Sequence, residues 1–345
     1  MLRQVPPIRA GNAMESSAKT LTLVTGGAGF IGSHLVEYLR GLGRRVLIID
    51  DLSTGRRRNV EHLLGDGCRL IQARVSEALR GPEAVLAGVG QVYHLAAAVG
   101  VRLVVSDPAG MIRNNVQETA DLLEAAAHSG AHVLIASSSE VYGRNPWMPL
   151  SEEQELVFGP TTSPRWSYGM SKALDEHLAL SWARAQGLGA VVVRLFNTIG
   201  PRQVGQYGMV VPRFIGWGLA GQPLEIHGDG RQTRSFCDVR DVVRALVTLL
   251  DNAAHHGEVF NVGSDAEISI DQLADRVIQL TGSSGGKRFV PYVQAFDGHF
   301  DDPVRRVPDV TKLHRAISFT PRFTLDQTLT ELVELARGIL MQPRS

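Results

Sequence analysis

A glycine-rich turn near the start of the chain constrains its fold more than any other feature. The apolar run 21–24, which predicts a buried strand, leads into Thr-Gly-Gly-Ala-Gly-Phe-Ile-Gly at residues 25–32. The first glycine lets the chain reverse, Gly29 lets backbone N–H groups approach a pyrophosphate at a helix N-terminus, and Gly32 lets helix and strand pack closely. Because the turn joins a predicted strand to a predicted helix, it indicates a dinucleotide-binding unit. The residues expected to contact the dinucleotide are Gly26, Gly29, Phe30, Ile31 and Gly32.

An acid at the end of the next predicted strand bears on the choice of dinucleotide. Asp50 follows the run 45–49, roughly 20 residues past the turn, where a carboxylate accepts hydrogen bonds from ribose hydroxyls. A carboxylate there favours NAD over NADP, because it would repel a 2′-phosphate. The nearby run Arg56–Arg58 is interpreted as a solvated surface.

The alternation of short apolar runs with longer helical patterns predicts an α/β fold with a Rossmann-type, doubly wound parallel sheet. After Gly200 the segments become irregular and rich in Gly, Pro and Arg, which indicates a smaller α/β substrate-binding lobe. We therefore expect a disordered extension at 1–19, a dinucleotide-binding domain at 20–196 and mainly the smaller lobe at 197–340. The predicted strands are 21–24, 45–49, 70–73, 91–95, 132–136 and 190–195, and the predicted helices are 34–41, 116–130, 167–186, 238–251, 269–280 and 325–340.

Composition and charge exclude several classes of function. The 35 Lys and Arg residues balance 35 Asp and Glu residues, so neither a nucleic-acid partner nor a membrane-surface role is expected. No apolar run is long enough to span a membrane. Cys68 and Cys237 lack the spacing of metal ligands, and we expect buried, reduced thiols in a cytoplasmic protein without a metal site.

The strongest chemical signal is a predicted strand that ends in polar residues. The run 132–136 leads into Ser137-Ser138-Ser139-Glu140, which places hydroxyls and a carboxylate at the carboxyl edge of the sheet, where open α/β folds bind ligands. Ser138 is expected to orient a substrate alcohol.

A second signal is the pair Tyr168 and Lys172, which share a face of a predicted helix because they lie four residues apart. An ammonium about 4 Å from a phenol contributes roughly 4 kcal/mol at an effective dielectric constant near 20. That energy corresponds to about three pKa units, enough to bring a tyrosine near 7. Tyr168 is therefore expected to take a proton from a substrate alcohol while NAD takes the hydride, and a bound cationic nicotinamide would act in the same direction.

Together these motifs resemble the extended short-chain dehydrogenase/reductase family, the NAD-dependent sugar-nucleotide epimerases and dehydratases. The resemblance implies further cofactor contacts, diphosphate-binding residues in the second lobe, and a homodimer through the helices near 116–130 and 167–186. Where family members often carry an acid that contacts adenine, this chain has Arg74-Val75, so backbone groups at Val75 would take that role. The matching segments are 25–32, 93–97, 138–143, 168–172, 194–202 and 228–236. The implied cofactor contacts are Val75, Leu95, Ala96, Ala97, Asn115, Tyr168 and Lys172, and the implied substrate contacts are Asn197, Arg202, Arg234 and Arg306.

Three details resemble the UDP-glucuronate decarboxylases in particular. Dehydratases of the family carry an acid where this chain has Ser139, the segment Pro164-Arg165-Trp166 precedes Tyr168 as in the decarboxylases, and 301–309 is similar to a segment of the UDP-xylose synthases. The implied reaction oxidises C4 of UDP-glucuronate, releases CO₂ from the β-keto acid and returns the hydride, giving UDP-xylose or its 4-keto intermediate. Arg306 and Ser139 would manage the carboxylate and the enolate charge.

The same resemblance implies two alternative roles for Glu140. It would handle the proton added at C5 or hold the water that supplies it. A carboxylate beside the substrate carboxylate would either promote CO₂ loss by repulsion or need to be protonated itself. Arg240 and Arg305 are expected to form ion pairs with nearby aspartates, namely Asp238 and either Asp301 or Asp309.

Other functions remain open at the level of sequence. A UDP-sugar 4-epimerase acting on UDP-glucose or UDP-glucuronate would need the same Ser138, Tyr168, Lys172 and NAD. A carboxylate held by Arg306 would oppose the rotation of the keto sugar that epimerisation requires. A dTDP-hexose 4,6-dehydratase and a non-catalytic NAD-binding regulator are less favoured, the second because a sensor need not retain the catalytic residues.

Overall fold

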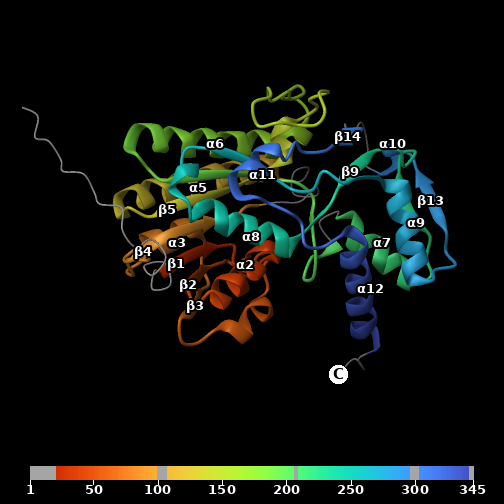
Figure 1. Ribbon diagram of the computed structural model, residues 1–345, viewed down its shortest axis with the longest axis horizontal. Coiled ribbons are helices and arrows are strands. Elements are labelled where there is room, and N and C mark those ends of the chain that lie inside the picture. The colour runs from red at the N-terminus through yellow and green to blue at the C-terminus, as the bar shows by residue number, and fades with distance from the viewer. Residues whose placement is uncertain (1–20, 99–106, 206–208, 296–302, 342–345) are drawn as a thin grey trace, which may run out of the picture.

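The computed structural model describes residues 21–98, 107–205, 209–295 and 303–341. The expected extension at 1–19 lies outside these residues. Two lobes are present, a larger one built on a seven-stranded sheet and a smaller one that contains α7, α9 and α12 (Figure 1).

The larger lobe is built on a parallel sheet with the strand order β11-β6-β5-β4-β1-β2-β3. The strand order reverses between β1 and β4, and ligands of open α/β sheets bind at such a switch point, outside the carboxyl ends of the strands. The turns that follow β1, β4 and β5 therefore meet at the same edge. The strands are β1 (Leu21–Thr25), β2 (Arg45–Ile49), β3 (Cys68–Ile71), β4 (Val89–His94), β5 (His132–Ser138), β6 (Ala190–Leu195) and β11 (Val259–Val262).

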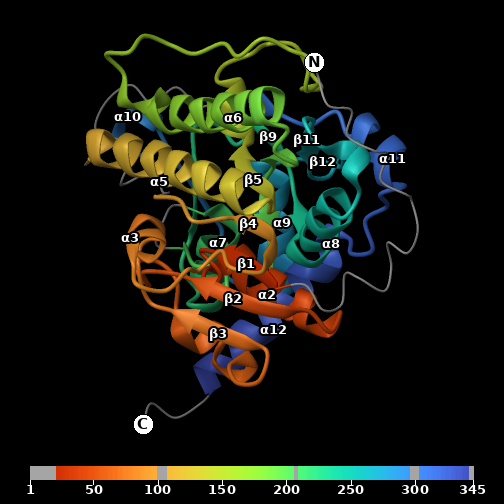
Figure 2. The same cartoon turned by 90° about the vertical axis from the view of Figure 1, so that its left-hand side faces the viewer.

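Helices cover both faces of this sheet (Figure 2). Successive strand residues point to opposite faces, so Leu23 and Val133 pack on one side whereas Val24 and Leu134 pack on the other. Helices α3 (Val75–Arg80), α5 (Pro108–Ser129) and α6 (Ser167–Gln186) cover the face with Leu23 and Val133, and α2 (Phe30–Gly41), α8 (Val239–Leu250) and α11 (Thr311–Ile317) cover the opposite face.

The smaller lobe packs short strands against helices around its own apolar core. The strand β9 pairs antiparallel with β12 and parallel with β14, and β8 pairs with β13. Its elements are α7 (Val210–Leu219), β8 (Leu224–His227), β9 (Thr233–Ser235), β12 (Glu267–Ser269), α9 (Ile270–Thr281), β13 (Lys287–Val290), α10 (Tyr292–Ala295), β14 (Arg305–Arg306) and α12 (Leu325–Met341), while β7 (Thr198–Ile199) and β10 (Cys237–Asp238) pair at the junction of the lobes.

The chain returns to the larger lobe after entering the smaller one. Strand β11 pairs with β6 at the edge of the main sheet, and α8 packs beside α2. A division of the chain near residue 197 therefore describes the lobes only in part, because segments from the second half complete the first lobe.

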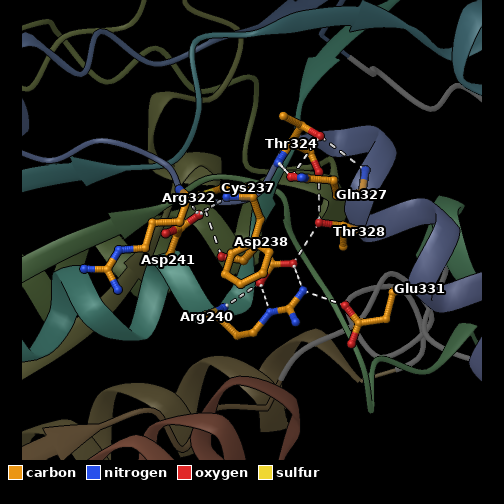
Figure 3. Close-up of polar contacts among 10 residues, drawn as sticks. Cys237, Asp238, Arg240, Asp241, Arg322, Thr324, Gln327, Thr328 and Glu331 are labelled. Carbon is orange, nitrogen blue, oxygen red and sulfur yellow. Dashed lines mark hydrogen bonds and ion pairs between the residues drawn. The ribbon is translucent and has the colours of Figure 1, made fainter.

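A buried carboxylate connects α8 to the C-terminal helix (Figure 3). Asp238, at the N-cap of α8, accepts hydrogen bonds from the backbone N–H of Arg240 at 2.8 Å and from the Thr328 hydroxyl at 2.7 Å. The Arg240 guanidinium forms ion pairs with Asp238 and with Glu331 of α12. The expected pairing of Arg240 is confirmed, and it ties α12 to the junction of the lobes.

The predicted helices and strands are present in the structure and follow one another in the predicted order. The main differences concern the residues at which they begin and end. The helix expected at 116–130 begins eight residues earlier, at Pro108, because Asp107 caps it and proline suits a first helical position. The third strand lies at Cys68–Ile71 rather than 70–73.

Both cysteines are buried and free. Within the described part of the chain, no helix is long and apolar enough to cross a membrane.

Candidate active site

A single cleft of about 1540 Å³ brings together all the residues that sequence reasoning placed at a site. Its walls come from the carboxyl edge of the main sheet and from the smaller lobe. The predicted residues that line it are Gly26, Gly29, Phe30, Ile31, Gly32, Asp50, Val75, Leu95, Ala96, Ala97, Asn115, Ser138, Ser139, Glu140, Tyr168, Lys172, Asn197, Arg202, Arg234 and Arg306.

The glycine-rich turn has the geometry that a pyrophosphate site needs. Gly26 has φ +68°, and a Cβ there would lie 2.8 Å from the backbone nitrogen of Ala96. A Cβ on Gly32 would lie 2.1 Å from the Gly26 carbonyl oxygen, so the helix α2 packs against the turn only with glycine at that position. Helix α2 begins directly after the turn and points its free N–H groups into the cleft.

Asp50 lies on the other side of this turn. Its carboxylate accepts hydrogen bonds from the backbone N–H groups of Ala28 at 2.9 Å and Leu52 at 2.8 Å. Burial raises the pKa of Asp50, while these backbone donors oppose the rise. The glycine turn, the helix N-terminus and this acid fit the pyrophosphate and ribose of NAD.

Asn115 shapes the loop that follows β4. Its side chain on α5 accepts a hydrogen bond from the Ala98 backbone N–H at 2.7 Å and donates to the Ala98 carbonyl at 3.3 Å. The side chain of Asn115 thus holds the backbone around Ala97 against the cleft. Nearby, Arg74 forms an ion pair with Glu118, and Val75 begins α3 at the cleft wall.

Ser138, Tyr168 and Lys172 meet where β5 ends beside the start of α6. Ser138 hydrogen-bonds to Tyr168 and accepts from the backbone N–H of Glu140. Lys172 is one helical turn beyond Tyr168, and its side chain is 3% exposed. Although burial favours the neutral amine, the facing groups Asp175 and Tyr168 raise the pKa of Lys172, which therefore stays an ammonium.

The pKa of Tyr168 differs from the value near 7 that the sequence led us to expect. Burial raises the pKa of Tyr168, and Glu140 and Asp175 raise it further, so the opposing effect of Lys172 does not bring it down in the free protein. The expected fall to near 7 counted one neighbouring charge and neither the burial nor the two carboxylates. A cation bound in the cleft would favour the phenolate.

Glu140 lies between two arginines that come from separate segments. Its carboxylate accepts from Arg306 of β14 at 2.5 Å and from Arg165 of the turn before α6 at 2.6 Å. Burial alone would raise the pKa of Glu140, but the two guanidinium groups outweigh it and lower the pKa to about 2. Glu140 is therefore ionised across the physiological range, which removes the possibility that it acts as a protonated acid in this state.

Strand alternation explains why Arg306 and not Arg305 reaches the cleft. Arg306 pairs in register with Arg234 of β9, and paired residues place their side chains on the same face. Arg305 points the opposite way and forms an ion pair with Glu267, with half of its side chain exposed. The expected ion pairing of Arg305 is thus confirmed in kind, with Glu267 in place of an aspartate.

The residues expected to bind the substrate diphosphate occupy different walls. Asn197 donates to the Ser235 carbonyl at 2.9 Å, and Arg234 is 8% exposed and donates to the Pro303 carbonyl. Arg202 has φ +69°, and its guanidinium contacts Glu37 of α2. Arg202 therefore lies against the larger lobe, on the side of the glycine turn, while Asn197 and Arg234 lie at the smaller lobe.

Sequence reasoning missed two charged residues at the site. Arg165 stands in the recognised segment before Tyr168, but nothing in the pattern showed that it would face Glu140. Asp175 lies three residues after Lys172 on α6 and 3.1 Å from its Nζ atom. The spacing from Lys172 was the only available signal for Asp175, because i and i+3 residues share a helix face.

Comparisons with known proteins agree with this geometry. The model of the NAD-dependent epimerase/dehydratase family matches residues 22–263. The chain belongs to this family. It is 39% identical over 322 residues to the UDP-N-acetyl-alpha-D-glucosaminuronate decarboxylase of Bacillus cytotoxicus, covering 93% of this chain and 99% of that protein. It is 36% identical to UDP-glucuronic acid decarboxylase 1 of Arabidopsis thaliana, covering 92% of this chain and 70% of that one.

Solved structures of the epimerase/dehydratase type share the fold. The UDP-glucuronic acid 4-epimerase of Bacillus cereus, in complex with UDP-glucuronic acid and NAD, superimposes with a TM-score of 0.81 at 30% identity, covering 92% of this chain and 99% of that one. The family resemblance, the doubly wound α/β fold and the NAD cofactor inferred from the sequence are thereby confirmed.

Proposed function

We propose that this protein is an NAD-dependent lyase that decarboxylates UDP-glucuronate to UDP-xylose or its 4-keto intermediate. The observation that carries the proposal is the cluster of Glu140, Arg165 and Arg306. Two guanidinium groups from separate segments converge on one carboxylate at the wall of the cleft, and both arginines line it. Arginine forks suit carboxylates, so these two residues can bind the carboxylate of a substrate. The relatives named as uronate decarboxylases support the same assignment.

The first step is oxidation at C4 of the sugar. Ser138 orients the C4 hydroxyl, and Tyr168 accepts its proton. NAD, when bound, supplies the acceptor for the C4 hydride and later returns it. Lys172, kept as an ammonium, stabilises the phenolate that Tyr168 becomes.

Loss of CO₂ follows from the β-keto acid. The bond between C5 and the carboxylate breaks, and its electron pair passes to the enolate whose oxygen lies at Ser138 and Tyr168. Arg165 and Arg306 hold the departing carboxylate, and Ser139 lies at the same end of β5. A proton then adds at C5, and because Glu140 is ionised we assign it the role of holding the water that delivers this proton. Return of the hydride to C4 and of the Tyr168 proton to the C4 oxygen completes the turnover.

The deciding experiment is incubation of the protein with NAD and UDP-glucuronate, followed by mass spectrometry. A product lighter by the mass of CO₂ is expected, with NAD unchanged in amount if UDP-xylose is released. A parallel reaction with UDP-N-acetylglucosaminuronate tests whether the C2 substituent decides the substrate, since both sugars carry the same carboxylate and C4 hydroxyl. A product of unchanged mass with inverted C4 would overturn the proposal in favour of the 4-epimerase.

Two further proposals concern the assembly of the protein and its location in the cell. We propose a homodimer in which α5 and α6, which lie side by side in Figure 2, face the partner, because Leu174 of α6 is half exposed. Sedimentation velocity would measure this state directly, and a monomer at assay concentrations would contradict it. A cytoplasmic location is proposed from the two buried, free cysteines.

A further inference from the structure

A buried carboxylate, Asp175, faces the lysine of the oxidation site. Its side chain is fully buried on α6, and its Oδ2 atom lies 3.1 Å from Nζ of Lys172. The proposed steps of the reaction give Asp175 no contact with substrate. A buried acid is costly to keep unless it is paired, so the pairing of Asp175 with a catalytic lysine needs an account.

The surroundings of Asp175 contain few other charges to share its effect. Thr119 of α5 hydrogen-bonds to Asp175, and it also contacts His94 of β4 at 3.2 Å. Burial, together with Lys172, lowers the pKa of His94 to about 3, so the imidazole is neutral. Glu176, the next residue on α6, is engaged by Arg194 and therefore contributes little net charge.

The charged groups that face Tyr168 shift its pKa in opposite directions. Lys172 favours the phenolate, whereas Asp175 on the same helix and Glu140 at the end of β5 favour the phenol. Glu140 forms ion pairs with Arg165 and Arg306. Asp175 forms an ion pair with Lys172 and offsets part of the charge that Lys172 presents to Tyr168.

We propose that Asp175 is a positioning residue that holds Lys172 as an ammonium while offsetting part of its charge, so that Tyr168 stays protonated until a cation enters the cleft. The oxidised nicotinamide ring is such a cation, and the reduced ring is neutral. Tyr168 thus becomes a base when the cofactor is ready to accept hydride and returns to an acid when hydride is to be given back. Asp175 in this way couples the proton state of Tyr168 to the charge of the cofactor.

The test compares the tyrosinate titration of the cofactor-free protein in Asp175→Asn and in the wild type, followed by ultraviolet difference absorbance. The matched Tyr168→Phe variant of each background is subtracted, which isolates Tyr168. Removing the charge is expected to lower the pH at which the Tyr168–Lys172 couple loses its proton by about one to two units. The acidic limb of turnover against pH should move in the same direction.

Three further variants keep the test specific. Asp175→Glu retains the charge and should keep the wild-type titration, even if turnover falls. Asp121→Asn removes a carboxylate from the surface of α5, where it pairs with Arg80, and should shift nothing. Should Asp175→Asn not fold, Asp175→Ser removes the same charge with a smaller side chain.

An unchanged or raised titration in a folded, charge-removed variant overturns the inference. The inference rests on the proposed oxidation by Tyr168, but the titration needs neither cofactor nor substrate. A protein that fails to release CO₂ and still shows the shift would therefore contradict the proposed function alone, whereas normal turnover without the shift would contradict the inference alone.

Discussion

Two acid–arginine clusters lie near the carboxyl end of strand β5 and differ in their position relative to the cleft. Glu176 of α6 accepts from both Nε and Nη2 of Arg194, at 3.0 and 2.8 Å, and from the Ser137 hydroxyl. Glu140 also accepts from arginine, but from two residues, Arg165 and Arg306. Of the first cluster only Ser137 lines the cleft, whereas all three residues of the second line it.

The comparison shows that ion pairing alone does not distinguish structure from function. The Glu176–Arg194 pair is complete, and the Tyr142 ring lies against the guanidinium with its centroid 4.8 Å away. In the Glu140 cluster both arginines line the cleft, whereas Arg194 does not. Arginines at the wall of a cleft can bind a ligand of the opposite charge, so the position relative to the cleft separates the two clusters.

Glu176→Gln should have the largest effect, and on stability. It leaves the Arg194 guanidinium buried without its counter-charge, which costs about 3–5 kcal/mol. Chemical denaturation of the wild type and the variant measures this loss. The folded fraction should keep its turnover number, and a stable variant with impaired turnover would show that this cluster is part of the catalytic machinery.

Arg306→Ala should have the next largest effect, and on catalysis. Loss of one charged hydrogen bond to the substrate carboxylate corresponds to about 1.5–3 kcal/mol, or roughly 10- to 100-fold in kcat/KM. Steady-state assays measure this change, and fluorescence titration should show NAD binding close to wild type.

Arg305→Ala is the matched control for this variant. It removes the neighbouring arginine, whose exposed ion pair with Glu267 contributes less than about 1 kcal/mol. Equal losses of turnover in the two variants would mean that the segment as a whole, and not the cleft-facing guanidinium, is what decarboxylation requires.

Glu140→Gln should have a smaller effect on stability than Glu176→Gln, and this effect should depend on pH. The folded pKa of Glu140, about 2, lies below its ordinary value of 4.5. The stabilisation it provides is therefore complete above about pH 4.5 and is lost as the pH falls toward 2. Unfolding free energies should differ by up to about 3 kcal/mol at neutral pH, and the gap should narrow below pH 4.5. A gap that stays constant with pH would show that Glu140 is not the titrating group.

Local patterns in the sequence predicted the fold class and most of the cleft. Each of these patterns involves residues that are close in the chain, namely the glycine turn, the end of β5 and the Tyr168–Lys172 spacing. Such residues keep the same relative positions in any fold of this class. The contact between Glu140 and Arg306 joins residues 166 positions apart, and no local pattern encodes it. The proton affinity of Tyr168 was not predictable either, because it depends on burial and on Asp175 as well as on Lys172.

The interleaving of the lobes limits how this protein can be recombined with its relatives. Strand β11 and helix α8 complete the larger lobe from the second half of the chain, while α12 is anchored to the junction through Asp238. A chimaera joined near residue 197 would give one parent's sheet the other parent's edge strand. Exchange of substrate preference is therefore better attempted by grafting the segment that contains β14, which brings a cleft-facing and an outward-facing arginine together, than by swapping whole halves.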